Sequence, residues 1–492
     1  MFNKKKKVTQ SEIDGVQYRR AKTWQIALGQ LNSAAAMCFY ILMGYASYLG
    51  NTGYGILTAT VGIILTGTRI FDGITDPIIA LLIDKTNTRF GKLRIFMFGG
   101  WLIESLAVVL LFIWCSGKGH GVLLFIFLYM LYVVGYTMNN VAGQIIPSVL
   151  TNDPKQRPVV GVWATVYNYL VPMIVSMIIT VGILPRFNNE YSVAMLASSC
   201  LVCIGVSFVL EILACLGVSG VDKPERFQGI SAQGKKEKVT LRDMWKLLKE
   251  NRSLQTYIIS AASDKLAQQT ASQAVVGTLL FGIVIGNMQL SAILSIIAML
   301  PSIIFAIFGA KYAGKHGNKE SVVTWTWVCT VIALVSIIFF LVIEPRQITV
   351  AAVPTVLFFI LTLLMNGAKM CVTTANGAMC ADIIDYELDR SGKYLPAAVT
   401  ATYSFIDKLI SSLGATIAAG AVALIGYTAV MPQPTDEPTT AIFAMAMVLY
   451  YGLPILGWVC TLVAMRFCPL SKEKMVEVQK NIQEKKKESK TE

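Results

Sequence analysis

A series of apolar runs constrains this chain most. Each is about 20 residues or longer, which is the length that an α-helix needs to cross the hydrocarbon core of a bilayer. Only 14% of the residues are charged and 55% are hydrophobic, whereas soluble domains have about 25% charged residues, so a soluble protein is excluded. We predict an all-α membrane protein with twelve transmembrane helices, near residues 25–49, 55–84, 94–116, 120–148, 159–185, 191–217, 253–285, 288–310, 321–344, 348–382, 396–427 and 440–467.

Lys and Arg are spread unevenly over the short connections between these runs. Eleven lie in the connections on one side of the membrane and three in those on the other. Cytosolic loops carry the excess of Lys and Arg, so the first side is predicted to be cytosolic. The basic N-terminal tail shows no signal-peptide pattern. We therefore expect a multi-pass protein of the cell membrane (plasma or inner) with both termini cytoplasmic.

One long connection divides the spans into two sets of six. The predicted organisation is a cytosolic N-terminal tail (1–24), an N-terminal six-helix half (25–217), a cytosolic linker with an amphipathic helix (218–252), a C-terminal six-helix half (253–468) and a cytosolic C-terminal tail (469–492). Weak similarity between residues 139–153 and 375–389 favours duplication. Carriers built from two such halves bind their solute between the halves, near the bilayer midplane.

Composition also excludes several functions. The net charge of +13 lies in short loops and tails without a basic domain, so we expect no nucleic-acid partner. The ten Cys are scattered without paired ligand spacing and there are two His, which argues against a zinc site and histidine-based catalysis. We predict a protein that is not an enzyme, has no cofactor, binds no metal beyond a coupling cation and functions as a monomer in the lipid bilayer.

Charged residues interrupt the second span. On a helix, Arg69, Asp72, Thr75 and Asp76 fall within a sector of roughly 120°, and each charge at mid-bilayer costs about 2.5–3.5 kcal/mol. A structural ion pair between Arg69 and Asp72 would explain one carboxylate and leave Asp76 over. Two carboxylates and a hydroxyl on one face are also suitable oxygen ligands for a small cation. We interpret this stretch as a cation site inside a membrane carrier.

These residues resemble a known family. The pattern Arg69-x-x-Asp72-x-x-x-Asp76-Pro77, followed by a basic loop, is similar to that of the glycoside–pentoside–hexuronide:cation symporters, the group of the melibiose and glucuronide carriers in the major facilitator superfamily. Further matches cover most spans: Arg89-Phe-Gly91-Lys92, Tyr136 through Pro147, Ala381 through Glu387, and Asp407-Lys408. The resemblance implies the major facilitator fold and transport by alternating access.

The resemblance also implies roles for individual residues. Asp72 and Asp76 would bind the coupling Na+ or H+, with Thr75 as a further polar ligand. Lys408 would lie near both cation and sugar. Independently of the resemblance, Arg69 lies one helical turn from Asp72 and can balance part of its charge, so Arg69 and Lys408 are the predicted ion-pair and coupling residues. Asn139 takes the position of a sugar-binding aspartate of the melibiose carrier. The family's Pro-Tyr pair in span four, its arginine in span five and its acidic residue in span one have no counterpart, so the substrate cannot be carried over.

Amides and hydroxyls inside the spans suit a neutral or singly charged polyhydroxylated solute, because such groups point inward in a bilayer. The predicted solute-binding residues are Asn32, Asn139, Asn140, Tyr167, Asn168, Gln268 and Lys408. Basic and acidic residues near the cytosolic ends of spans two and ten are predicted to form a cytosolic gate; alternatively, they are solvated positive-inside charge. The gate residues are Asp84, Arg89, Lys92, Asp382 and Asp385.

The functional prediction is a secondary active transporter, a symporter that couples a monovalent cation (Na+ or H+) to a sugar or glycoside-like solute. Two alternatives stay open at this point. One is a cation-coupled carrier of lysolipid or another amphiphile. The other is a sensor with the carrier fold that binds solute without transporting it.

Overall fold

A computed structural model describes residues 20–86, 88, 90–91, 93–151, 156–222, 241–392 and 396–488. Within these ranges the chain is helical, without strands, and each of the twelve predicted spans coincides with one helix or a consecutive series of helices. The first half contains α2 (Thr23–Gly29), α3 (Leu31–Met43), α4 (Ala46–Tyr48), η1 (Leu49–Gly53), α5 (Thr58–Lys85), α6 (Leu93–Val109), η2 (Leu110–Trp114), α7 (Gly121–Leu150), α8 (Arg157–Met177), η3 (Ile178–Ile183), η4 (Leu184–Phe187) and α9 (Val193–Ser219).

The second half begins with a short surface helix, α10 (Leu241–Glu250), where the amphipathic helix was predicted. It continues with α11 (Arg252–Ala271), α12 (Ala274–Gly277), η6 (Thr278–Val284), α13 (Gln289–His316), α14 (Asn318–Val342), η7 (Pro345–Thr349), α15 (Ala352–Ser391), α16 (Pro396–Leu424), α17 (Thr440–Met447), η8 (Val448–Gly452), α18 (Leu453–Arg466) and α19 (Lys472–Glu488).

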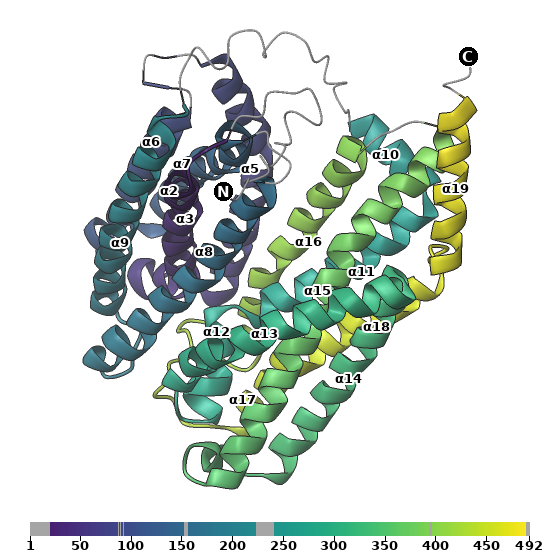
Figure 1. Ribbon diagram of the computed structural model, residues 1–492. Coiled ribbons are helices and arrows are strands. Elements are labelled where there is room, and N and C mark those ends of the chain that lie inside the picture. The colour runs from purple at the N-terminus through teal and green to yellow at the C-terminus, as the bar shows by residue number, and fades with distance from the viewer. Residues whose placement is uncertain are drawn as a thin grey trace, which may run out of the picture.

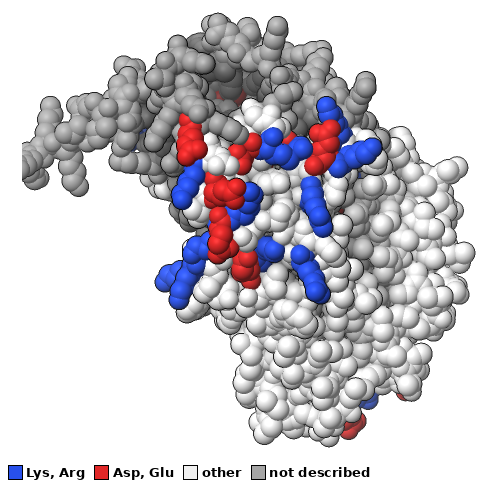
Figure 2. Space-filling model, turned by 90° about the vertical axis from the view of Figure 1, so that its right-hand side faces the viewer, with Lys and Arg blue, Asp and Glu red and all other residues white. Residues whose placement is uncertain are grey.

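Large apolar side chains cover much of the outer surface. Leu123 is 84% exposed, Val342 77% and Leu364 40%. Nine helices of the described ranges are long and apolar enough to cross a membrane, or ten if the bent pair Ala274–Val284 and Gln289–Ala298 is one span. In Figure 2, charged side chains gather towards one end of the face shown, and most of the remaining surface is uncharged. An apolar surface of this extent is expected to contact the lipid of a bilayer rather than water.

The helices α2 to α9 form one bundle and α10 to α19 the other, and the two bundles diverge towards the end that carries α10 and α19 (Figure 1). Hydrogen bonds join the bundles elsewhere. The Asn51 amide nitrogen donates to the Ala429 carbonyl at 2.8 Å, and the Asn51 amide oxygen accepts from the Met431 backbone nitrogen at 2.8 Å. The Tyr48 hydroxyl donates to the Pro432 carbonyl at 2.9 Å. The loop between α16 and α17 is therefore one junction between the halves, and α5 packed against α16 is another, where Thr66 donates to the Ser412 carbonyl at 2.8 Å.

Two residues, Ser272 and Gln273, interrupt the seventh predicted span. The α-helix α11 ends at Ala271 and α12 begins at Ala274, with extended backbone at Gln273 (φ −62°, ψ 137°). An interruption is tolerated inside a membrane only where the freed backbone groups face protein or a water-filled cavity. The interruption therefore marks a place where a cavity is expected.

Candidate functional site

A lysine of α16 bridges the two acidic residues of α5. The Lys408 ammonium forms an ion pair with the Asp76 carboxylate and lies 3.8 Å from Oδ2 of Asp72. The side chains of Asp72, Asp76 and Lys408 are 15%, 30% and 44% exposed, so the cluster is partly open. Since α5 belongs to the first half and α16 to the second, this ion pair joins the halves. Among the described ion pairs, Lys408 is paired with the two aspartates of α5 and not with its neighbour Asp407.

Two hydroxyls complete the surroundings of Asp72. Thr137 of α7, which is fully buried, donates a hydrogen bond of 2.8 Å to Oδ1 of Asp72. The Thr75 hydroxyl donates to the Asp72 backbone carbonyl at 3.0 Å and lies 3.2 Å from the Thr137 hydroxyl. Carboxylate, hydroxyl and carbonyl oxygens thus converge on one side of α5, and such oxygens are the ligands that hard cations prefer.

Thr137 was not among the residues predicted from sequence, although it lies in the polar stretch of the fourth span. Replacing Thr137 with Val keeps the shape of the side chain and removes the donor to Asp72. Since a hydrogen bond to a charged group contributes about 1.5–3 kcal/mol, we expect the affinity for the coupling cation to fall by roughly tenfold or more. Cation titration of the purified protein, followed by solute binding at saturating cation, measures this. A Thr137→Ser variant is the control and should retain most of the affinity.

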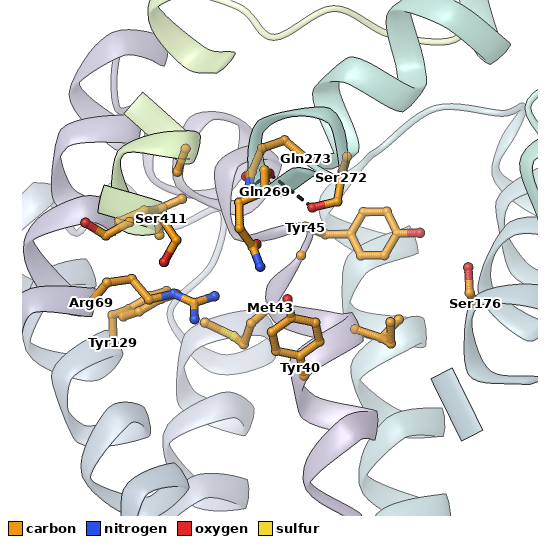
Figure 3. Close-up of a pocket in the computed structure, with 16 residues that line it drawn as sticks. Tyr40, Met43, Tyr45, Arg69, Tyr129, Ser176, Gln269, Ser272, Gln273 and Ser411 are labelled. Atoms are coloured by element: carbon orange, nitrogen blue, oxygen red, sulfur yellow. Dashed lines mark hydrogen bonds between the residues drawn. The ribbon is translucent and has the colours of Figure 1, made fainter. Parts of the chain in front are cut away.

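Arg69 is not in direct contact with the Asp72 carboxylate. No ion pair joins these two described residues; instead, the Arg69 guanidinium lies 5.9 Å from the centre of the Tyr40 ring. Arg69 is exposed in the cavity between the halves, and its guanidinium points into this space (Figure 3). The structural ion pair that was considered as an alternative for the second span is therefore not formed, and the positive partner of the aspartates comes from α16.

The cavity lies between the two bundles and has a volume of about 300 Å³. Arg69 enters it from α5, and Ser411 and Ser412 enter it from α16. Gln269 reaches in from the last turn of α11, near the interruption, and its amide faces the space beside Arg69 (Figure 3). The described residues that line the cavity are Tyr40, Ile41, Met43, Gly44, Tyr45, Leu65, Arg69, Tyr129, Ser176, Gln269, Ser272, Gln273, Ala274, Ser411, Ser412 and Ala415.

Two of the predicted solute-binding residues lie in the core of the first half, away from this cavity. Asn32 is 1% exposed and Asn139 0%. The Asn32 amide nitrogen donates to the Asn139 amide oxygen and lies 3.3 Å from Oε2 of the buried Glu211. Gly143 makes room for this arrangement, because a Cβ at that position would collide with the Asn32 amide oxygen. In this conformation the two asparagines bind each other and join α3, α7 and α9.

The other predicted solute-binding residues also lie outside the lining of the cavity. Tyr167 packs against Trp163 with ring centres 5.6 Å apart, and Asn168 is exposed on α8. Asn140 is half-buried on α7. Gln268 donates to Oδ2 of Asp264 at 2.9 Å, so that its neighbour Gln269 faces the cavity instead. The sequence located the polar turns, but a rotation of about 100° per residue decides which amide faces the cavity.

The predicted gate is described only in part. Asp382 accepts a hydrogen bond of 2.7 Å from the Asn318 amide at the start of α14. Asp385 accepts one of 2.8 Å from the Gln479 amide of α19. Both partners belong to the second half. Arg89, Lys92 and the side chain of Asp84 lie outside the described residues, so the gate stays a prediction.

Known transport proteins are similar to this chain over most of its length. The family model described as "MFS/sugar transport protein" matches residues 26–472. The chain is 24% identical over 445 residues to a protein of Escherichia coli (strain K12) named "Putative glycoside/cation symporter YagG", covering 88% of this chain and 90% of that protein. It is 23% identical over 408 residues to the uncharacterized symporter YjmB of Bacillus subtilis (strain 168), covering 81% of each.

Solved structures show the same fold. The nucleoside transporter NupG is similar with a TM-score of 0.61 at 12% identity, covering 90% of this chain and 100% of that chain. A bacterial homologue of the lysosomal transporter Spinster, in an inward-facing and unoccupied conformation, is similar with a TM-score of 0.58 at 12% identity, covering 94% and 98%. These similarities show the fold, and they confirm the predicted all-α architecture.

Proposed function

Because this chain belongs to the MFS/sugar transport protein family, we propose that it is a symporter, not an enzyme, and that it couples a monovalent cation to a sugar or glycoside. The name of YagG, a glycoside/cation symporter, supports this assignment. The predicted cation ligands are Asp72, Asp76, Thr75 and, from the structure, Thr137.

The observation that carries the proposal is the position of the acidic cluster next to the cavity. Arg69 lines the cavity and precedes Asp72 by three residues on α5, while Ser411 and Ser412 line it and follow Lys408 by one turn on α16. One helical turn rises about 5.4 Å. A cation at the aspartates and a solute in the cavity would therefore share two helices, one from each half.

This geometry suggests how coupling works. Lys408 now supplies the positive charge between the aspartates, so a cation that binds there competes with the ammonium for Asp76. Displacement of Lys408 would break an ion pair between the halves and move α16, whose next turn forms the cavity wall. A change in solute affinity caused by the cation requires an equal change in cation affinity caused by the solute. Each ligand would thus favour binding of the other.

The choice of ion and the orientation are part of the proposal. Two carboxylates with two nearby hydroxyls supply several oxygen ligands, which suits Na+ more than H+. The Lys and Arg excess supports a cytosolic position for the end that carries α10 and α19, and we propose that both termini are cytosolic. The halves diverge towards this end (Figure 1). We therefore assign the structure to an inward-facing state of a monomeric carrier in the cell membrane.

The test is transport by the purified protein in proteoliposomes. A panel of sugars and glycosides is offered with an inward Na+ gradient, an inward H+ gradient or neither. Accumulation that requires one of the gradients and is blocked by excess free sugar supports the proposal. Uptake that is blocked by lysolipids alone would replace it with an amphiphile carrier. Saturable binding without counterflow would replace it with a sensor.

A further inference from the structure

A second cavity adjoins the one beside Arg69. It also has a volume of about 300 Å³ and lies between α8 and η3 of the first half and α11 to α13, α15 and η8 of the second. The two cavities share five lining residues, which include Ser272 and Gln273 at the interruption of the seventh span. The described residues of the second lining are Tyr45, Ser176, Thr180, Ala271, Ser272, Gln273, Ala274, Gly277, Phe281, Met288, Ser291, Leu294, Ser295, Thr362, Asn366 and Tyr450.

The second cavity differs in charge from the first. Of the described side chains that line the two cavities, only Arg69 is charged, and it belongs to the first. The second lining consists of hydroxyls, two amides, aromatic rings and apolar groups, which include Met288 and Leu294. A wall of this kind suits a neutral ligand rich in hydroxyl groups, because each hydroxyl can both donate and accept a hydrogen bond.

Several polar groups of this wall have unused hydrogen-bonding capacity. Ser295 is satisfied within its own helix, where it donates to the Ser291 carbonyl at 2.9 Å. By contrast, the side chains of Ser176, Thr362 and Asn366 are half-buried and form no hydrogen bond with another described residue. Thr362 and Asn366 are four residues apart on α15, so they present a hydroxyl and an amide on one face of the helix. Ser176 comes from α8 of the other half.

We infer that the second cavity is a separate solute subsite, which takes the second ring of a disaccharide or the neutral outer group of a glycoside, with Thr362 and Asn366 of α15 as the residues that determine solute length. The inference depends on the proposed function as a sugar carrier. The first ring would lie beside Arg69 and Gln269, and the second ring would extend past Ser272 and Gln273 towards α15.

The position of this subsite has a consequence for transport. Ser176 and Thr180 belong to the first half, whereas Thr362 and Asn366 belong to the second. A two-ring solute would therefore contact both halves at the seam between α8 and α13, in addition to the seam between α5 and α16. A single ring beside Arg69 would leave this second set of polar groups unsatisfied, so the longer solute should bind more tightly.

The test compares disaccharides with their constituent monosaccharides: lactose with galactose, cellobiose with glucose, and xylobiose with xylose. The variants are Thr362→Val, which keeps the side-chain shape, and Asn366→Ala. Thr373→Val is the matched control, because Thr373 is an exposed threonine on the same helix whose hydroxyl donates to the Lys369 carbonyl at 3.0 Å. Binding to the purified protein and counterflow in proteoliposomes are both measured.

We expect the disaccharide affinity to fall by roughly tenfold in each subsite variant, as for a lost buried hydrogen bond, with monosaccharide affinity nearly unchanged. The Thr373→Val variant should behave like the parent. Equal losses for short and long sugars, or no loss for either, would overturn the subsite while leaving sugar transport intact. If the parent protein binds neither class, the proposed function itself fails and the inference with it.

Discussion

Replacing Asp76 with Asn is expected to abolish cation-driven accumulation of the solute. Asp76 is the carboxylate in direct contact with Lys408 and is one of two acidic residues on the same face of α5. Asn keeps the size of the side chain and removes its charge. Loss of the contact between the bound cation and the Asp76 carboxylate, in a partly buried site, costs roughly 3 kcal/mol. We therefore expect cation affinity to fall by about two orders of magnitude. The Asp72→Asn variant should behave similarly, because its amide oxygen can still accept the hydrogen bond from Thr137 but carries no negative charge.

The measurement separates coupling from transport. Proteoliposomes that contain the Asp76→Asn protein should still exchange solute in counterflow, because the cavity lining is unchanged, but should not concentrate it against a gradient. Glu344→Gln, an exposed carboxylate in the loop after α14, serves as the control and should accumulate solute normally. Full Na+ or H+ dependence in both aspartate variants would show that the coupling ion binds elsewhere.

Replacing Lys408 with Met is expected to impair the coupling of cation and solute transport. It should also leave the protein dependent on added cation for its stability. The variant retains two neighbouring carboxylates with no ammonium between them. Because the three side chains are partly exposed, we expect a loss of about 1–3 kcal/mol in the absence of Na+. Na+ at 100 times its dissociation constant should restore about 2.7 kcal/mol, since it binds only the folded protein.

Thermal unfolding with and without Na+ measures this effect, and uptake measures coupling. The parent should gain less from Na+ than the variant does, because Lys408 already occupies the space between the aspartates. Lys311→Met, an exposed lysine on α13, is the control and should respond like the parent. A Lys408→Met protein with parental stability, parental Na+ response and unchanged coupling would show that the lysine has only a packing role.

Much of the fold could be predicted from local patterns. A span is defined by its length and apolarity, and both are properties of a continuous segment, so all twelve predicted spans coincide with helices. The surface helix α10 was also predicted, because its apolar and charged residues alternate with helical periodicity. The interruption at Ser272 and Gln273 was not predicted, since nothing in its composition distinguishes it from a continuous polar turn.

The candidate site could be predicted only where its residues share one helix. Helical periodicity brings Asp72, Thr75 and Asp76 to one face without any knowledge of packing. Lys408 was linked to them only by resemblance to a family, and Thr137 was not linked to them. Their contacts depend on how α16 and α7 pack against α5, which involves residues that are far apart in the chain.

The sequence by itself determined that this chain spans a membrane in two halves and carries two acidic residues on one face of its second span. These properties follow from segment length, apolarity and a fixed rotation per residue. Only the tertiary structure decided that Lys408, and not Arg69, pairs with the aspartates, and that Gln269, and not Gln268 or Asn139, lines the cavity. Such choices depend on the docking of one helix against another, because rotating a helix by one residue turns a side chain from the cavity into the core.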